Sequence, residues 1–133
     1  MIFIDTGAFV ARYIQKDQYN EKAIGFWNNL KEQNQKLYTS NFVLNEAFTI
    51  LAGRAGYKFA SERARNIYIS EVIDIIRPVE EDERIAIDYF EKYSNLKVSF
   101  TDCISFTLIQ RYRINRVFTF DKHFEIAGYK IYP

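Results

Sequence analysis

The sequence predicts an α/β fold in which a mainly parallel sheet is covered by helices on both faces. Three observations favour this class. Short apolar runs of strand length alternate along the chain with longer segments of helical periodicity. The runs are continuous, as in Ile2-Phe3-Ile4, which is typical of strands buried on both faces. The 133 residues, 48% of them hydrophobic, suffice for one core, so a single domain over residues 1–133 is expected.

Apolar spacing defines the elements of the first half of the chain. A strand is expected at 2–4, where the apolar run meets the turn residues Asp5-Thr6-Gly7. Helical periodicity then predicts helices at 8–15 and 19–33, and a short apolar run predicts a strand at 37–39. A further helix is expected at 41–55, because glycines near its end stop the pattern.

The same alternation continues to the last residues. The expected elements are a helix at 58–73, a strand at 75–76 before Pro78, helices at 80–93 and 102–113, and strands at 117–120 and 130–132. In parallel sheets, ligands gather beyond the carboxyl ends of the strands. Asp5 and Asp121 both lie just past such an end.

Four carboxylates are candidate metal ligands. Asp5 and Asp121 follow strands, Asp102 begins a helix, and Glu46 lies at the border between the polar and apolar sides of helix 41–55. Taken singly, they also fit a turn residue, a helix-dipole partner or a boundary residue facing solvent. Together they can point into one crevice. Mg²⁺ prefers oxygen ligands from a few carboxylates plus a substrate phosphate, so the set indicates a Mg²⁺ or Mn²⁺ site.

Other chemistries find little support. One histidine, His123, disfavours a zinc site and the acid–base pair that an attack by an RNA 2′-hydroxyl would use. One cysteine, Cys103, rules out an internal disulfide and suits a reducing cytoplasm. No apolar run approaches the ~20 residues of a membrane span, and the first residues lack the basic region of a signal peptide. We therefore expect a cytoplasmic protein.

Charge and aromatic content each leave two interpretations open. The net charge is only +1, but four cations cluster in the sequence at Arg54, Lys58, Arg63 and Arg65. This cluster is either a local basic groove for RNA or an ordinary solvated helix face. The 17% aromatic residues are either core fillers or part of an interface patch.

The chain resembles the PIN-domain nucleases, and closely the VapC-type toxins of toxin–antitoxin pairs. The resemblance covers the whole length and rests on four strings: Phe3-Ile4-Asp5-Thr6, Asn45-Glu46-Ala47, Phe100-Thr101-Asp102-Cys103 and Thr119-Phe120-Asp121-Lys122-His123-Phe124. It implies a three-layer sandwich in which Asp5, Glu46, Asp102 and Asp121 bind metal. It also implies that Thr6, Thr101 and Thr119 orient ligands or waters beside them. Phe106 departs from the family, where a small residue is common, so the cleft is expected to differ locally.

The resemblance further implies a Mg²⁺- or Mn²⁺-dependent endoribonuclease that cleaves tRNA or mRNA, pairs with itself and binds a cognate antitoxin. Surplus aromatics around Tyr57, Phe59 and Tyr68 fit such association. The main alternative is a catalytically silent RNA-binding or scaffold module on the same fold, for which a four-acid set is unnecessary. An RNase H-like fold would need a β-meander where residues 8–33 have a helical pattern. A phosphatase with an Asp nucleophile would need a second Asp two residues after Asp5.

Overall fold

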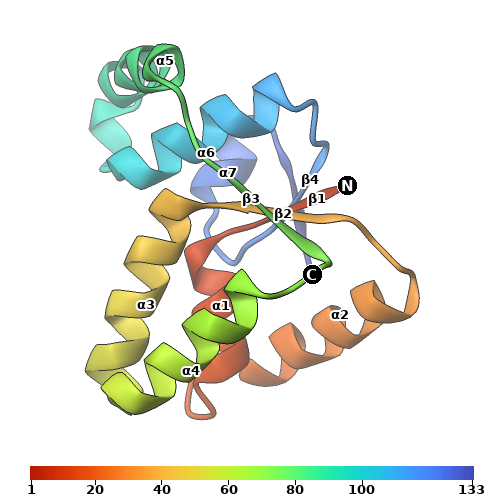
Figure 1. Cartoon of the computed structure of the whole chain (residues 1–133). Coiled ribbons are helices and arrows are strands. Elements are labelled where there is room, and N and C mark those ends of the chain that lie inside the picture. Colours follow the sequence, from red (N-terminus) through yellow and green to blue (C-terminus); the bar gives the residue numbers. More distant parts are fainter.

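The computed structural model describes residues 1–133, and its five strands form one parallel sheet (Figure 1). In spatial order these are β3 (Ile73–Ile76), β2 (Leu37–Ser40), β1 (Ile2–Ile4), β4 (Arg116–Phe118) and β5 (Lys130–Tyr132). The central strand is β1, in which Phe3 is in register with Tyr38 of β2 and with Val117 of β4. The carboxyl ends of β1 and β4 therefore adjoin, and the residues that follow them meet.

Helices cover both faces of the sheet (Figure 1). One face carries α1 (Thr6–Tyr13), α2 (Asn20–Glu32), α3 (Asn41–Ala55) and α4 (Tyr57–Tyr68). The other carries α5 (Glu80–Lys92), a 3₁₀ turn at Ser94–Leu96, α6 (Phe100–Arg111) and the short α7 (His123–Ile126). Strand order explains this division. The steps from β1 through β2 to β3 run in one direction and the step back to β4 runs in the other, so right-handed crossovers place their helices on opposite faces.

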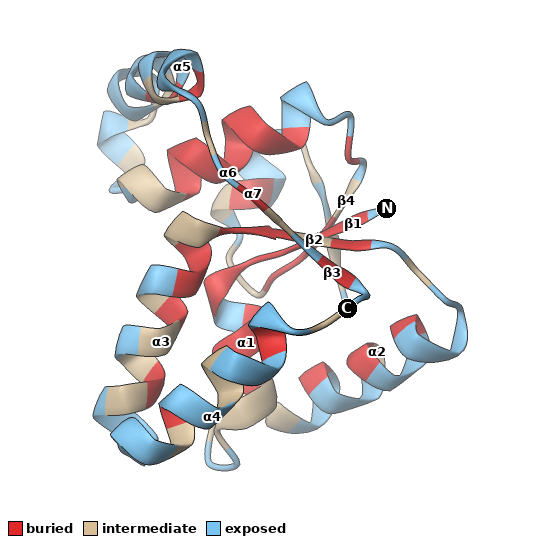
Figure 2. Cartoon of the chain, in the orientation of Figure 1, coloured by how far each residue is buried: buried red, intermediate tan, exposed pale blue.

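The core lies between the sheet and the two helical layers. Buried residues line the strands and the helix sides that face them (Figure 2). Phe106 belongs to this core, because it is fully buried and its ring centroid lies 5.0 Å from that of Phe124 and 5.8 Å from that of Tyr129. Phe106 is thus part of the core, and its effect on the local shape of the cleft stays a prediction. None of the helices is both long enough and apolar enough to span a membrane.

The predicted fold class is confirmed, and helix α3 has the predicted bounds. The helix predicted at 58–73 ends at Tyr68, because Ile73 and the residues after it pair with β2 instead. Helix α6 begins two residues earlier than predicted, since Ser99 caps its first turn. Strand β4 ends at Phe118, and the residues up to Asp121 form a connection. The sequence pattern does not predict α7 or the 3₁₀ turn, which are too short to show periodicity.

Candidate active site

A cavity of about 450 Å³ lies at the carboxyl end of the sheet, and all four predicted carboxylates line it. Asp5 follows β1, Glu46 lies in the middle of α3, Asp102 lies in the first turn of α6, and Asp121 follows β4. Residues far apart in the sequence are thus gathered by the topology of the sheet. The four carboxylates therefore border the same cavity.

Asp5 is the most buried of the four acids, with 4% of its surface exposed. Its backbone N–H donates to the carbonyl of Phe118, and its Oδ2 accepts a hydrogen bond of 2.9 Å from Thr119 Oγ1. Its Oδ1 is buried and has no hydrogen-bond partner. Although Asp5 precedes α1, its side chain makes no capping hydrogen bond. Burial, followed by the charge of Asp102, raises the Asp5 pKa to about 7.

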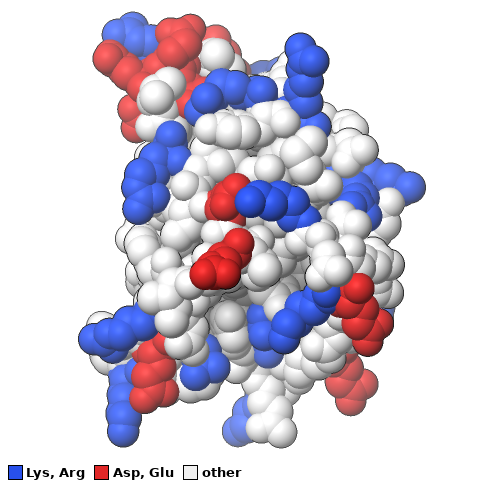
Figure 3. All heavy atoms as spheres, turned by 45° about the vertical axis from the view of Figure 1, so that its right-hand side comes forward, with Lys and Arg blue, Asp and Glu red and all other residues white.

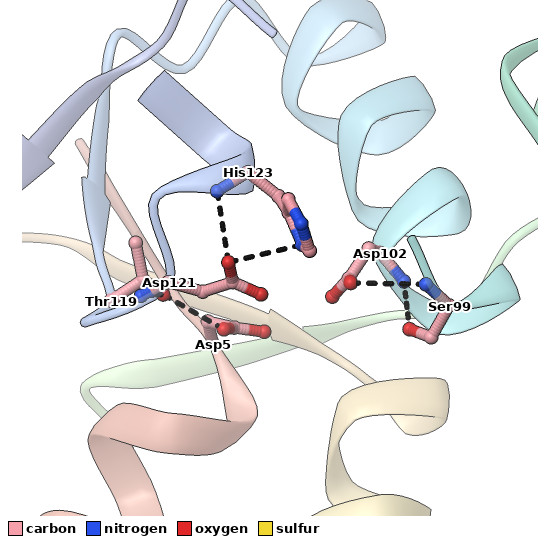
Figure 4. A network of polar contacts seen from close by, with 6 residues as sticks. All are labelled: Asp5, Ser99, Asp102, Thr119, Asp121 and His123. Carbon is pink, nitrogen blue, oxygen red and sulfur yellow. Dashed lines mark hydrogen bonds and ion pairs between the residues drawn. The ribbon is translucent and has the colours of Figure 1, made fainter. Parts of the chain in front are cut away.

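Asp102 is held at the start of α6 by reciprocal capping with Ser99 (Figure 4). The Asp102 N–H donates to Ser99 Oγ over 3.1 Å, and the Ser99 N–H donates to Asp102 Oδ2 over 3.3 Å. Burial and then the charge of Asp121 raise the Asp102 pKa to about 6, with Glu46 adding in the same direction. Asp102 therefore has a local role as a capping residue and is also part of the acidic cluster.

Asp121 lies opposite Asp102 and contacts His123 (Figure 4). Its Oδ1 accepts a 2.8 Å hydrogen bond from the His123 N–H and lies 3.2 Å from His123 Nδ1. One ligand atom each from Asp102, Asp121 and His123 lie within 4.8 Å of one another. His123 was absent from the predicted ligand set. Its position two residues after Asp121, within the most specific string of the sequence, is the signal that could have identified it.

The three threonines differ in position. Thr119 is buried and links two of the acids, because its Oγ1 donates to Asp5 Oδ2 and accepts from the Asp121 N–H over 3.0 Å. Thr6 is buried and lines the cavity, and its Oγ1 has no hydrogen-bond partner. Thr101 does not line the cavity, and its hydroxyl makes no hydrogen bond. Because α6 begins earlier than predicted, Ser99 contacts Asp102 in place of Thr101.

The predicted cation cluster does not form one groove at the cavity. Only Arg54 lines it, with Nη1 3.7 Å from Asp17 Oδ2. Lys58 and Arg65 are exposed on α4 outside the cavity, and the Arg63 guanidinium lies 5.3 Å from the centre of the Phe59 ring. Figure 3 shows mixed charges on this view of the surface, with acidic side chains gathered over α5 and no continuous basic band. The closeness of these four cations in the sequence therefore did not predict which of them lines the cavity.

The residues of the cavity fit a divalent cation. All four acids offer carboxylate oxygens, the donor type that Mg²⁺ and Mn²⁺ prefer. The buried Asp5 Oδ1 lacks any partner, which is costly for a carboxylate unless a cation or proton compensates it. Mutual repulsion among the acids also raises the pKa of Asp5 and of Asp102, and a positive ion would relieve that repulsion.

Comparisons with known proteins agree with this geometry. The profile of the PIN domain matches residues 2–128. The 23S rRNA-specific endonuclease VapC20 of Mycobacterium tuberculosis is 29% identical over 129 residues, which cover 97% of this chain and 95% of that protein. The crystal structure of Mycobacterium tuberculosis VapC20, described as a sarcin-ricin loop cleaving toxin, has a TM-score of 0.88 and 27% identity, with complete coverage of both chains.

A more distant structure shares the fold. FitAcB from Neisseria gonorrhoeae has a TM-score of 0.74 at 16% identity and covers 100% of this chain and 97% of its own. The PIN domain match spans β1 to β4, all of the helices and all four carboxylates of the cavity. The chain therefore belongs to the PIN-domain family.

Proposed function

We propose that residues 1–133 form one PIN domain that acts in the cytoplasm as a metal-dependent endoribonuclease, the toxin of a toxin–antitoxin pair. The convergence of Asp5, Glu46, Asp102 and Asp121 in one cavity carries the proposal. The similarity to VapC20, an endonuclease by name, supports the same reaction over nearly the whole chain. A silent scaffold would have no use for four mutually repelling carboxylates.

In the proposed mechanism, the oxygens of the four acids would hold Mg²⁺ or Mn²⁺. When bound, such a cation would supply Lewis acidity, which lowers the pKa of a water and neutralises negative charge at the phosphate. Thr119 fixes the Asp5 carboxylate relative to the backbone of Asp121, and Ser99 fixes Asp102. The His123 imidazole keeps Asp121 oriented through its 3.2 Å contact. Together these contacts preorganise the acids around the phosphodiester, which is cleaved to 5′-phosphate and 3′-hydroxyl ends.

The proposed substrate is a structured RNA. The VapC20 relatives are named for 23S rRNA, whereas the family resemblance suggested tRNA or mRNA. A panel of 23S rRNA, a sarcin–ricin loop hairpin, tRNA and an unstructured mRNA would separate these classes. Cleavage confined to the hairpin and to 23S rRNA would assign the target that the relatives have.

The reaction is tested by incubating the purified protein with total RNA in Mn²⁺, Mg²⁺ or EDTA. Cleavage is expected only with metal and is expected to be lost in Asp5→Asn and Asp102→Asn. Asp74→Asn is a matched control, because Asp74 is a half-exposed acid of β3 paired with Lys36, outside the cavity. Cleavage that survives EDTA or either cavity substitution would contradict the mechanism. RNA binding without cleavage in any metal would favour the silent module.

We also propose a homodimer that binds an antitoxin. Tyr57 and Tyr68 are 81% and 53% exposed on α4, whereas Phe59 is half-buried beneath Arg63. Exposed aromatic rings such as these offer contact area to a second copy of the chain. Light scattering of the protein at micromolar concentration is expected to give twice the 15.8 kDa chain mass. A monomer mass across that range would refute the dimer.

A further inference from the structure

The cavity holds two long cations, Arg54 and Lys97, in different situations. Arg54 lies 3.7 Å from the Asp17 carboxylate, so part of its charge is already balanced. Lys97 makes no ion pair, although its cavity is lined by five carboxylates: Asp5, Asp17, Glu46, Asp102 and Asp121. Its ammonium charge is therefore available to a ligand. Lys97 lies outside the cation cluster predicted from the sequence.

The backbone at Lys97 is left-handed, with φ 54° and ψ 38°. Side chains other than Gly, Asn and Asp are disfavoured in this region, so lysine is a poor choice for the turn alone. The conformation is fixed from both sides. The 3₁₀ turn precedes it, with the Leu96 N–H donating to the Tyr93 carbonyl, and the buried Val98 and the capping Ser99 follow it. The same backbone conformation occurs at Arg113 outside the cavity, so the turn fixes where the Lys97 side chain starts, and the position of Lys97 in the cavity carries the argument.

This turn places Lys97 in the lining of the cavity, two residues before the Ser99 cap that holds Asp102. The cavity is strongly acidic, and an RNA backbone that crosses it brings further negative charge. The carboxylates repel those RNA phosphates that lie beside the metal site and are not bound by the metal. A cation next to the acids offsets this repulsion. Lysine suits this task, because its ammonium is a point charge on a flexible stem.

We propose that Lys97 binds an RNA phosphate adjacent to the one that is cleaved and so positions the strand across the carboxylates. The inference rests on the proposed nuclease function. It assigns part of RNA binding to the α5–α6 connection, and not to α4, which carries three of the four clustered cations and does not line the cavity.

Arg113 provides a matched control. It is also an exposed cation with φ 54°, but it lies beyond the far end of α6 and does not line the cavity. Lys97→Asn and Arg113→Asn each remove one charge from a left-handed position that asparagine tolerates. Lys97→Arg keeps the charge. All three are made in a Glu46→Gln background, in which the proposed mechanism predicts no cleavage, so that binding is measured on intact RNA in Mn²⁺.

The measurement is the Kd of a fluorescent RNA hairpin as a function of salt. Lys97→Asn is expected to weaken binding about five-fold at about 0.1 M salt and to flatten the plot of log Kd against log salt by about one unit, because one fewer counterion is released. Lys97→Arg and Arg113→Asn are expected to have the same Kd and the same salt slope as the Glu46→Gln protein. An unchanged slope for Lys97→Asn, or an equal change for Arg113→Asn, would overturn the assignment.

Cleavage by the protein without substitutions separates the two proposals. If it cleaves RNA but the salt slope does not respond to Lys97→Asn, the role of Lys97 is wrong and the nuclease stands. If it neither cleaves nor binds RNA with any metal, the proposed function fails and the role of Lys97 fails with it. Thermal unfolding of each variant verifies that the fold is intact.

Discussion

Asp5 carries a charge that the metal-free fold disfavours. Burial and neighbouring acids raise its pKa to about 7, and one of its oxygens has no partner. Asp5→Asn is therefore expected to stabilise the metal-free protein by about 1 kcal/mol or more, because the amide removes the repulsion. Thermal unfolding in EDTA measures the effect. Mn²⁺ should then raise the melting temperature of the unsubstituted protein more than that of Asp5→Asn.

The control for this charge effect is Asp74→Asn, which removes a surface carboxylate 3.0 Å from Lys36. It is expected to leave the melting temperature unchanged or slightly lower, and the response to Mn²⁺ unchanged. A loss of stability in Asp5→Asn in EDTA would mean that Asp5 acts as an ordinary structural residue.

Thr119 is the residue whose hydroxyl serves two acids. Thr119→Val keeps the shape but leaves the Asp5 carboxylate and the Asp121 N–H without their partner. Activity is expected to fall about 10- to 100-fold, as for other residues that orient metal ligands, with about 1–3 kcal/mol lost in stability. Thr119→Ser should retain most activity. Thr107→Val, which removes a buried hydroxyl bonded within α6, should leave activity unchanged, and a nuclease assay compares the three.

Single residues were predicted unevenly from the sequence. The four acids were predicted as a set, because two follow strands, one begins a helix, one lies at the border of a helix's polar side, and all four stand in strings that resemble the PIN-domain nucleases. Lys97 was not, because its importance depends on a left-handed turn and on a cavity built from distant elements. Arg63 shows the opposite error. It was predicted to bind RNA because it belongs to a basic cluster in the sequence. In the structure its guanidinium lies against the rings of Tyr13 and Phe59, which the sequence pattern did not predict.

At the scale of elements, the cap of α6 links stability to the site. Ser99→Ala removes the hydroxyl that accepts from the Asp102 N–H, which is expected to lower stability by about 1 kcal/mol. Because the Ser99 hydroxyl also lowers the Asp102 pKa, the pH profile of cleavage should move to higher pH. Chemical denaturation and a pH–rate series measure the two effects.

The matched control is Ser40→Ala, since Ser40 caps α3 by accepting from the Val43 N–H over 3.1 Å without contacting an acid. It should cost similar stability and leave the pH profile in place. Equal profiles for the two alanine variants would show that the Ser99 hydroxyl does not act on Asp102.

The elements themselves were largely predictable, for reasons that differ along the chain. Helix α3 buries Val43, Leu44, Ala47 and Leu51 and has a serine cap and a terminal glycine, so local signals agree over Asn41–Ala55. The end of α4 was misplaced because the apolar residues after Tyr68 continue the helical pattern. Only their pairing with β2 makes β3 a strand, and pairing between distant segments overrides local propensity.

For the whole molecule, the acidic cluster sets a pH dependence of stability. Asp5 and Asp102 have folded-state pKa values of about 7 and about 6, above the ordinary value of 3.8. Between pH 4 and 7 the folded protein therefore binds more protons than the unfolded chain, so these two groups make the free energy of unfolding fall as pH rises. Denaturation in EDTA at pH 5 and pH 7.5 should show this loss. Asp5→Asn should reduce it, and saturating Mn²⁺ should reverse its sign, because metal binds the ionised acids.

The hydrogen bond between Thr119 and Asp5 joins residues 114 positions apart, and β4 inserts beside β1, the first strand of the chain. During translation, a nascent chain that has not yet extended beyond β4 has neither Asp121 nor the hydroxyl that holds Asp5. Such a chain cannot have a complete cleavage centre, however well its earlier helices have formed. Fragments released by interrupted synthesis would therefore lack at least one of the four carboxylates that line the cavity. An enzyme directed against RNA thus gains its full set of cavity carboxylates only when nearly all of its fold has been translated.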